Sequence, residues 1–255
     1  MKRSGTGERG FSAELAEQDD PPIGQERIRV RFNDGRVEEL RLHDYERLYA
    51  LPGVYEAIVS DRLGCRSPAV IAGMLAAAAD RLGWDRAGVR VLDVAAGNGV
   101  SGEALAAEGL VPVIGTDIVP AARAAALRDR PGLYERYVIL DLLRVSDDAA
   151  GDVRALALDA LCCVAPVGEA PGQLPAGALA AAAGLLAADA LIAYMYDPVV
   201  EARDPITPAL WASHPSGALV VEARKLARRR YVHRQTVTGL PYEMIGVVWR
   251  VRRAA

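Results

Sequence analysis

Three glycines and a nearby aspartate are the residues of this chain best suited to chemistry. The stretch "VLDVAAGNGVSG", residues 91–102, places Gly97, Gly99 and Gly102 at the G-x-G-x-x-G spacing of a nucleotide-binding turn. Gly97 and Gly99 let the backbone approach a ligand where a Cβ atom would collide, and the start of the following helix offers free N–H groups. Asp93 lies four residues before the first glycine, inside an apolar run. We interpret the stretch as the ligand-binding turn of a strand–turn–helix unit.

The carboxylate of Asp93 distinguishes between two classes of ligand. A dinucleotide pyrophosphate uses the helix N-terminus directly, and an acid on the preceding strand would oppose its phosphates. A carboxylate there suits a cationic or zwitterionic ligand such as S-adenosyl-L-methionine (SAM), which carries a sulfonium and an amino-acid group. Asp93 could reach the ammonium directly, reach it through water, or only brace the loop, and the sequence leaves these roles open.

Two further acids end the next two predicted strands. Asp117 ends "VPVIGTD", where its carboxylate can accept hydrogen bonds from both ribose hydroxyls of an adenosine ligand. Asp141 ends "YVILD", where it can accept a hydrogen bond from the adenine amino group. Their neighbours Ile118 and Leu142 can sandwich the adenine ring. Ligands of parallel sheets bind outside the carboxyl ends of the strands, so we expect all these residues at one site.

The strands and helices predicted to carry these residues alternate from residue 89 onward. Strands are predicted at 89–94, 111–116, 137–141, 160–165 and 191–196, and helices at 102–108, 120–130, 145–157 and 175–188. This alternation predicts an α/β, doubly wound, mostly parallel sheet with helices on both faces. The segments 227–239 and 242–253 predict a closing C-terminal antiparallel hairpin.

The part of the chain before the sheet has a different composition. Residues 1–24 are polar and are expected to be a disordered tail. Within residues 25–84, alternating apolar residues flank the turn sequence Asn33-Asp34-Gly35, which predicts a β-hairpin. Helical segments interrupted at Pro52-Gly53 follow and complete an N-terminal cap. The remainder, residues 85–255, is expected to form the ligand-binding Rossmann-like domain.

With these motifs the chain resembles the class I SAM-dependent methyltransferases. The resemblance rests on "VLDVAAGNG", "GTDIVPAA" and "YVILDLL" and covers residues 85–255, and the runs "GNGVSGEALAAEG" and "RDRPGLYERYVILDLL" are most like small bacterial enzymes of unassigned substrate. One departure is Ala95-Ala96, where the family commonly has glycine before its G-x-G. The resemblance implies a Rossmann-like sheet of seven strands and SAM as the cofactor. The cofactor-binding residues it implies are Asp93, Gly97, Asn98, Gly99, Asp117, Ile118, Asp141 and Leu142.

Candidate residues for the acceptor side come from the cap and from the fifth parallel strand. Tyr45 and Tyr49 are spaced i, i+4 on one predicted helical face, and Tyr55 follows the Pro-Gly break. Aromatic faces stabilise a sulfonium by cation–π contact, although packing of the cap on the core explains these tyrosines equally. Tyr196 and Asp197 end the fifth strand and are expected to point toward the same pocket. The sequence identifies no general base.

The resemblance implies methyl transfer to a small-molecule acceptor, either O- or N-methylation in bacterial specialised metabolism. An enzyme that consumes SAM itself, by cyclisation or elimination of its aminobutyryl arm with release of methylthioadenosine, would use the same motifs. An NAD-dependent oxidoreductase and a SAM-binding regulator without activity are further alternatives. The sequence does not separate these activities from one another.

Composition and charge disfavour several partners. The formal net charge of −3 gives no reason to expect nucleic acid, and the loop "CCVAPVGEAPG" lacks the motifs of nucleobase methyltransferases. The longest apolar stretch, residues 176–196, contains Gly184 and Asp189 and indicates a buried helix and strand instead of a membrane span.

The remaining expectations concern metals, location and assembly. Cys65, Cys162 and Cys163 form no C-x-x-C pair, and no cluster has metal-ligand spacing, so no metal is expected. No secretory signal is recognised, which favours a cytoplasmic location. The oligomeric state is open, with a homodimer as one option.

Overall fold

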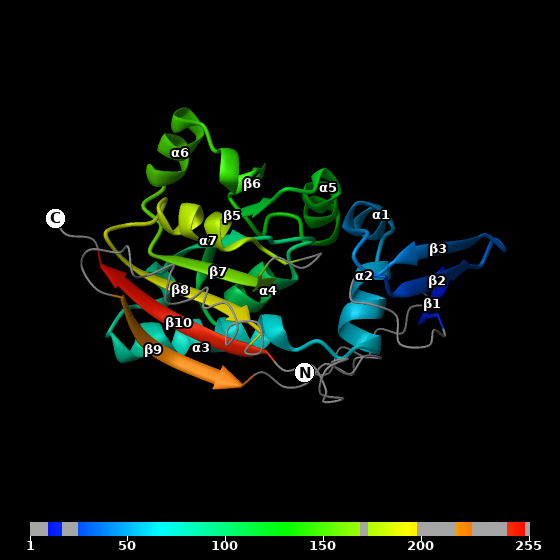
Figure 1. The fold of residues 1–255 in the computed structure, drawn as a ribbon, viewed down its shortest axis with the longest axis horizontal. Helices are drawn as coiled ribbons and strands as arrows, with labels where there is room; N and C mark the ends of the chain where they lie inside the picture. The colour runs from blue at the N-terminus through cyan, green and yellow to red at the C-terminus, as the bar shows by residue number, and fades with distance from the viewer. Residues whose placement is uncertain (1–9, 17–24, 169–172, 198–217, 226–243, 253–255) are drawn as a thin grey trace.

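The chain folds into a large α/β unit and a smaller N-terminal unit (Figure 1). The computed structural model describes residues 10–16, 25–168, 173–197, 218–225 and 244–252. The described strands form one sheet of seven strands and one sheet of three strands.

The larger sheet has the order β6-β5-β4-β7-β8-β10-β9. Its strands are β4 (Arg90–Val94), β5 (Val111–Asp117), β6 (Arg136–Ile139), β7 (Ala160–Val167), β8 (Asp189–Tyr196), β9 (Ala218–Lys225) and β10 (Ile245–Arg252). Neighbouring strands from β6 to β8 are parallel, whereas β10 is antiparallel to both β8 and β9. The predicted doubly wound, mostly parallel sheet with a C-terminal antiparallel hairpin is therefore confirmed.

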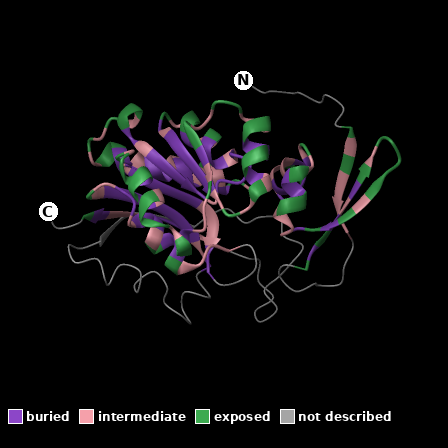
Figure 2. Cartoon of the chain, turned by 90° about the horizontal axis from the view of Figure 1, so that it is seen from above, coloured by how far each residue is buried: buried purple, intermediate pink, exposed green. Residues whose placement is uncertain are grey.

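Helices cover both faces of this sheet, so the central strands are buried on both sides (Figure 2). The helices are α3 (Ser67–Arg81), α4 (Val100–Ala107), α5 (Pro120–Asp129), α6 (Asp147–Arg154) and α7 (Ala176–Ala183), with short helical turns η2 (Arg86–Gly88) and η3 (Leu142–Arg144). One buried cluster includes residues of α3 and α4, and another includes residues of α6 and α7. Strands buried on both faces consist of nearly continuous apolar residues.

The adjacent cysteines of β7 illustrate this two-sided burial. Cys162 belongs to the cluster beneath α3, and Cys163 belongs to the cluster beneath α7, because successive side chains of a strand point to opposite faces. Burial raises the pKa of both thiols, which keeps them protonated. Both cysteines therefore serve as small apolar core residues, as their position in an apolar strand suggests.

The N-terminal unit consists of three antiparallel strands and a helical segment. The strands are β1 (Phe11–Leu15), β2 (Arg27–Phe32) and β3 (Val37–Arg41), with β2 in the centre. The helical part comprises α1 (Tyr45–Ala50), α2 (Val54–Glu56) and a π-helical segment η1 (Ala57–Arg62). The predicted hairpin and the break at Pro52-Gly53 are confirmed.

Two expectations about the chain ends need correction. The segment 1–24 is not wholly a disordered tail, because Phe11, Ala13 and Leu15 alternate along β1 and pack on the apolar cluster of this unit. Only these three apolar residues alternate within an otherwise polar segment, which is too short a pattern to predict a strand. The strand is stabilised by its antiparallel pairing with β2. The expected hairpin arm 227–239 lies outside the described residues, and the strand that pairs with β10 is the earlier β9.

The alanine-rich stretch 176–196 forms α7 and β8, as expected of a buried helix and strand. Within the ranges that the structure describes, no helix combines the length and apolarity needed to cross a membrane.

Candidate functional site

The glycine turn connects the end of β4 to the start of α4. Gly97 and Gly99 have φ angles of +55° and +89°, and Gly99 is the N-cap residue of α4. Ala95 also adopts a positive φ of 54°, a conformation that glycine takes with less strain. The turn therefore has the sharp backbone path that its glycine spacing predicts.

A cavity of about 290 Å³ lies beside this turn, between the carboxyl ends of the strands and the N-terminal unit. Five of the predicted cofactor-binding residues line it: Asn98, Asp117, Ile118, Asp141 and Leu142. All three cap tyrosines, Tyr45, Tyr49 and Tyr55, line it from the opposite side. Residues from the turn, from two strand ends and from the cap thus meet at one cavity.

Asp117 holds the glycine turn in place while facing the cavity. Its Oδ2 accepts a 2.9 Å hydrogen bond from the Gly97 amide, and its Oδ1 accepts a 3.0 Å bond from the Val119 amide. Burial raises the pKa of this carboxyl, and the two amides oppose that rise. Each carboxylate oxygen has more than one acceptor site, so both can still receive hydrogen bonds from a ligand.

Asp93 is fully buried and does not line the cavity. Its Oδ2 accepts hydrogen bonds from the Tyr134 hydroxyl at 2.6 Å and the Ser101 hydroxyl at 2.7 Å. Burial raises the pKa of this carboxyl to about 7, although the hydrogen bonds from Tyr134 and Ser101 lower it. Of the three roles that the sequence left open, bracing the loop is the one this geometry supports.

The cap tyrosines form a continuous aromatic group. The rings of Tyr45 and Tyr49 stack with centroids 5.8 Å apart, and Tyr55 lies 5.1 Å from Tyr49. Tyr49 also packs directly on the glycine turn, because a Cβ atom at position 97 would lie 2.9 Å from its Cζ. Gly97 is therefore needed twice, for its positive φ and for this close approach.

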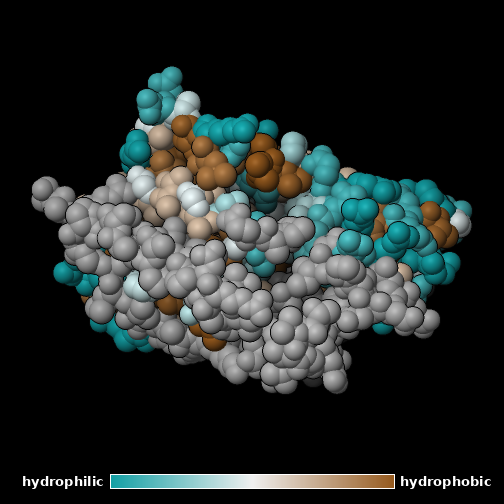
Figure 3. Space-filling view, viewed as in Figure 1, coloured by the Kyte–Doolittle hydropathy of each residue, from teal (hydrophilic) through white to brown (hydrophobic). Residues whose placement is uncertain are grey.

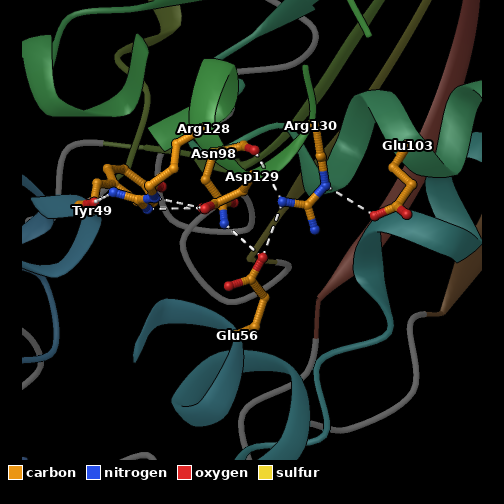
Figure 4. A network of polar contacts seen from close by, with 7 residues as sticks. All are labelled: Tyr49, Glu56, Asn98, Glu103, Arg128, Asp129 and Arg130. Atoms are coloured by element: carbon orange, nitrogen blue, oxygen red, sulfur yellow. Dashed lines mark hydrogen bonds and ion pairs between the residues drawn. The ribbon is translucent and has the colours of Figure 1, made fainter. Parts of the chain in front are cut away.

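Polar contacts connect the cap to the glycine turn (Figure 4). Glu56 Oε1 accepts hydrogen bonds from Asn98 Nδ2 at 2.8 Å and from an Arg130 guanidinium nitrogen at 3.0 Å. Arg130 also donates to the Asn98 carbonyl at 3.0 Å and to Glu103 on α4 at 2.9 Å. Through these bonds the cap, the turn and the end of α5 form one connected network.

The structure does not bring Tyr196 and Asp197 to the cavity. The Tyr196 ring packs against the core and lies 6.3 Å from the ring of Tyr194, and Asp197 is buried, with 3% of its surface exposed. The end of a parallel strand fixes where the backbone lies but not which way each side chain points. Gly97, Gly99 and Asp93 also do not line the cavity. The two glycines set the backbone path of the turn, and Asp93 braces it.

Several residues at the site have no recognisable motif in the sequence. The Tyr137 hydroxyl donates a 2.6 Å hydrogen bond to the Gly97 carbonyl, and Tyr134 braces Asp93. Glu26 and His43 line the cavity from the N-terminal unit. A partial signal exists for Tyr134, because Gly102 leaves the space that its ring occupies.

Apolar side chains are exposed near the mouth of the cavity. Ile118 and Leu143 line the cavity and are 63% and 58% exposed, and Ile139 at the end of β6 is 37% exposed. Figure 3 shows hydrophobic residues gathered on this side of the molecule. A flat apolar group such as a purine ring could cover these side chains.

Comparison with solved structures identifies the fold. The structure is similar to the plantazolicin methyltransferase BpumL in complex with a pentazolic desmethylPZN analog and SAH (S-adenosylhomocysteine), with a TM-score of 0.54, 11% identity, and coverage of 84% of this chain and 97% of that one. It is also similar to PH1948 from Pyrococcus horikoshii, described provisionally as an RNA methyltransferase, with a TM-score of 0.51, 16% identity, and coverage of 71% and 83%. No protein-family model matches the sequence, and no curated protein matches it.

These similarities show that the chain has the Rossmann-like fold of class I SAM-dependent methyltransferases. The match to BpumL includes part of the N-terminal unit, because 84% of the chain is a longer stretch than residues 85–255. The implied fold is thus confirmed, and the individual site residues remain predictions.

Proposed function

We propose that the protein is a SAM-dependent methyltransferase that acts on a small-molecule acceptor. The observation that supports this most strongly is the convergence of Asp117, Asp141 and the cap tyrosines on one cavity beside the glycine turn. Fold alone does not define function, so the proposal depends on this site.

The residues of the cavity fit the separate parts of SAM. Asp117 offers carboxylate oxygens to the ribose hydroxyls, and Ile118 and Leu142 offer apolar surfaces to the adenine ring. Asp141 lines the same cavity, and we assign it the hydrogen bond from the adenine amino group. Asn98 and Tyr49 also line the cavity, and we assign them to the amino-acid end and the sulfonium. Asp93 and Gly97 act indirectly, by holding the turn.

SAM supplies an electrophilic methyl group when it is bound. The protein's own contribution is to orient the reactants and to exclude water. The network of Glu56, Asn98 and Arg130 holds the cap against the turn, and the tyrosines of that cap close the cavity. We propose on this basis that the N-terminal unit, within the predicted range 25–84, completes the acceptor site of the domain at 85–255.

The charges that line the cavity support a small acceptor that is neutral or cationic. Glu26, Asp117 and Asp141 contribute carboxylates, and none of the described residues of the lining is lysine or arginine. Nucleic acids are bound mainly through phosphate contacts with such cations. We therefore propose O- or N-methylation of a small molecule in bacterial specialised metabolism, and we expect no nucleic-acid partner. A cytoplasmic location and a homodimer stay predictions.

Mass spectrometry of the products tests this function. The full-length protein is incubated with SAM and fractions of a bacterial metabolite extract, and both nucleosides and acceptors are analysed. Methyl transfer predicts SAH together with a metabolite that has gained one methyl group. Release of methylthioadenosine without a methylated product would instead assign the chemistry of the aminobutyryl arm. Conversion of the added SAM to neither SAH nor methylthioadenosine would contradict both activities.

A further inference from the structure

Three ionisable side chains of the N-terminal unit form a chain along the cavity wall. His43 lies between Glu26 and Tyr45, and all three residues line the cavity. The Nδ1 atom of His43 lies 3.1 Å from the Tyr45 hydroxyl, and Nε2 lies 3.8 Å from Oε2 of Glu26. The side chains of His43 and Glu26 are 16% and 6% exposed, so both are held largely away from bulk water.

The contacts of His43 define the proton positions that this chain can use. A neutral imidazole carries one N–H and one acceptor nitrogen, and the partner of each nitrogen decides which is which. With the proton on Nε2, beside the carboxylate of Glu26, Nδ1 accepts the hydrogen bond of the Tyr45 hydroxyl. A second proton arriving at Nδ1 would create an imidazolium next to a carboxylate, which stabilises the charged form.

We propose that Glu26, His43 and Tyr45 form a proton relay that takes the proton of a phenolic acceptor during methyl transfer. The proposal rests on the methyltransferase function proposed above and extends it by naming the acceptor class and the proton path. Tyr45 faces the acceptor, His43 stores the proton, and Glu26 positions His43 and stabilises its charge.

The strength of the base favours a phenol over an aliphatic alcohol. A phenolic hydroxyl has a pKa of about 10 and an imidazolium about 6.5, a gap small enough for general-base catalysis as the oxygen becomes alkylated. An aliphatic alcohol is a far weaker acid and lies beyond the reach of such a base. The stacked rings of Tyr45 and Tyr49 also offer a flat aromatic surface to a planar acceptor.

Atoms and charges balance along this path. The acceptor oxygen gains the methyl group as the carbon–sulfur bond breaks, and the electron pair of that bond stays on sulfur. The acceptor O–H donates its proton to Tyr45 Oη, and Tyr45 passes its own proton to His43 Nδ1. The products are a methyl ether, SAH and a protonated His43, which releases its proton to water after the product leaves.

A phenol whose anion is coloured tests the relay without knowledge of the natural acceptor. The full-length protein saturated with SAH is titrated with 4-nitrophenol, buffered so that the free phenol stays mostly protonated, and the visible absorbance of the phenolate is followed. The relay predicts a saturable phenolate signal in the wild type. His43→Gln and Tyr45→Phe should each lower that signal at least tenfold, and Glu26→Gln should lower it several-fold.

Glu39→Gln is the matched control for Glu26→Gln, because Glu39 lies on β3 of the same N-terminal unit, pairs with Arg29 and does not line the cavity. The control should keep the wild-type signal. SAH affinity is measured separately for every variant, and Tyr45→Phe keeps the ring that packs on Tyr49, which protects the test against misfolding.

Each outcome supports or overturns a defined part of the proposal. A wild-type protein that binds SAH but gives no phenolate signal, or whose signal survives His43→Gln, overturns the relay and leaves the methyltransferase function intact. A signal that survives Tyr45→Phe but not His43→Gln overturns the role of Tyr45. Failure of the wild type to bind SAH overturns the proposed function, and the relay falls with it.

Discussion

The Gly97 amide donates a 2.9 Å hydrogen bond to Asp117 Oδ2, and this bond joins the glycine turn to the carboxyl end of β5. The same carboxylate faces the cavity, so it both fixes the turn and offers acceptor sites to a ribose. Ligand binding and turn geometry are therefore coupled through a single side chain.

Asp117→Asn should weaken SAH binding by roughly 10- to 100-fold, because a hydrogen bond to a charged group contributes about 1.5–3 kcal/mol. Asparagine preserves the size of the side chain and can still accept one backbone amide, whereas alanine would also release the turn. Isothermal titration with SAH measures the effect. Asp148→Asn, on the exposed first turn of α6, is the control and should bind normally. Equal SAH affinity in Asp117→Asn and wild type would show that Asp117 does not take part in binding SAH.

Gly97→Ala should destabilise the protein more than Gly132→Ala does. Both glycines have positive φ angles, of +55° and +76°, which strain an alanine by on the order of 1–3 kcal/mol. Only position 97 adds a collision, because Tyr49 lies against it whereas no atom lies within 4 Å of a Cβ at position 132. The extra loss should be about 1–3 kcal/mol by denaturant unfolding.

Tyr49→Phe provides the second step of that experiment, since it removes the hydroxyl that lies against position 97. Combined with Gly97→Ala, it should recover part of the lost stability. If the two glycine variants unfold at the same denaturant concentration, then Tyr49 does not rest on the turn in solution.

Glu56→Gln should loosen the cap. Glu56 bonds both Asn98 and Arg130 and is 23% exposed, whereas the other carboxylate partner of Arg130, Glu103, is 65% exposed. The exposed pair should contribute well under about 1 kcal/mol. Amide hydrogen exchange of residues 45–62 should therefore accelerate several-fold in Glu56→Gln and stay unchanged in Glu103→Gln. Faster exchange in Glu103→Gln alone would contradict the assigned network.

Asp93 should make stability depend on pH in the direction opposite to most carboxylates. Its pKa is raised to about 7 in the folded protein and is about 4 in an unfolded chain. Between these values the folded state holds a proton that the unfolded state has lost, so stability falls as pH rises from about 4 to 7. The full difference between the folded and unfolded pKa of Asp93 corresponds to roughly 4 kcal/mol of unfolding free energy.

Asp93→Asn removes this titration and keeps an oxygen for Tyr134 and Ser101. Urea unfolding at a series of pH values should therefore show the variant gaining stability relative to wild type as pH rises. A constant difference between the two proteins from pH 4 to 8 would mean that Asp93 is ionised in the folded state throughout.

The sheet was predictable because its signals are local and repeat along the chain. Apolar runs that end in Asp117 and Asp141, separated by helical segments, define parallel strands whose ends meet at one edge. The cap tyrosines were predictable as a group because i, i+4 spacing places Tyr45 and Tyr49 on one face. These features depend only on periodicity and on the geometry of the backbone.

The residues that escaped prediction depend on contacts between distant segments. Glu26 and His43 meet only because β2 and β3 pair, and neither residue stands in a motif. The short β1 is stabilised by pairing with β2, which its own sequence does not show. Asp197 directly follows the end of β8, as expected, but it is not among the residues that line the cavity.

Isothermal titration of the full-length protein with SAH, beside a parallel titration with NAD, tests whether the cavity beside the glycine turn binds SAM. The cavity predicts saturable binding of SAH with a dissociation constant on the micromolar scale, corresponding to about −8 kcal/mol, and no measurable binding of NAD. Binding of NAD in preference to SAH, or no heat with SAH at millimolar concentration in folded protein, would show that the cavity is not a SAM site.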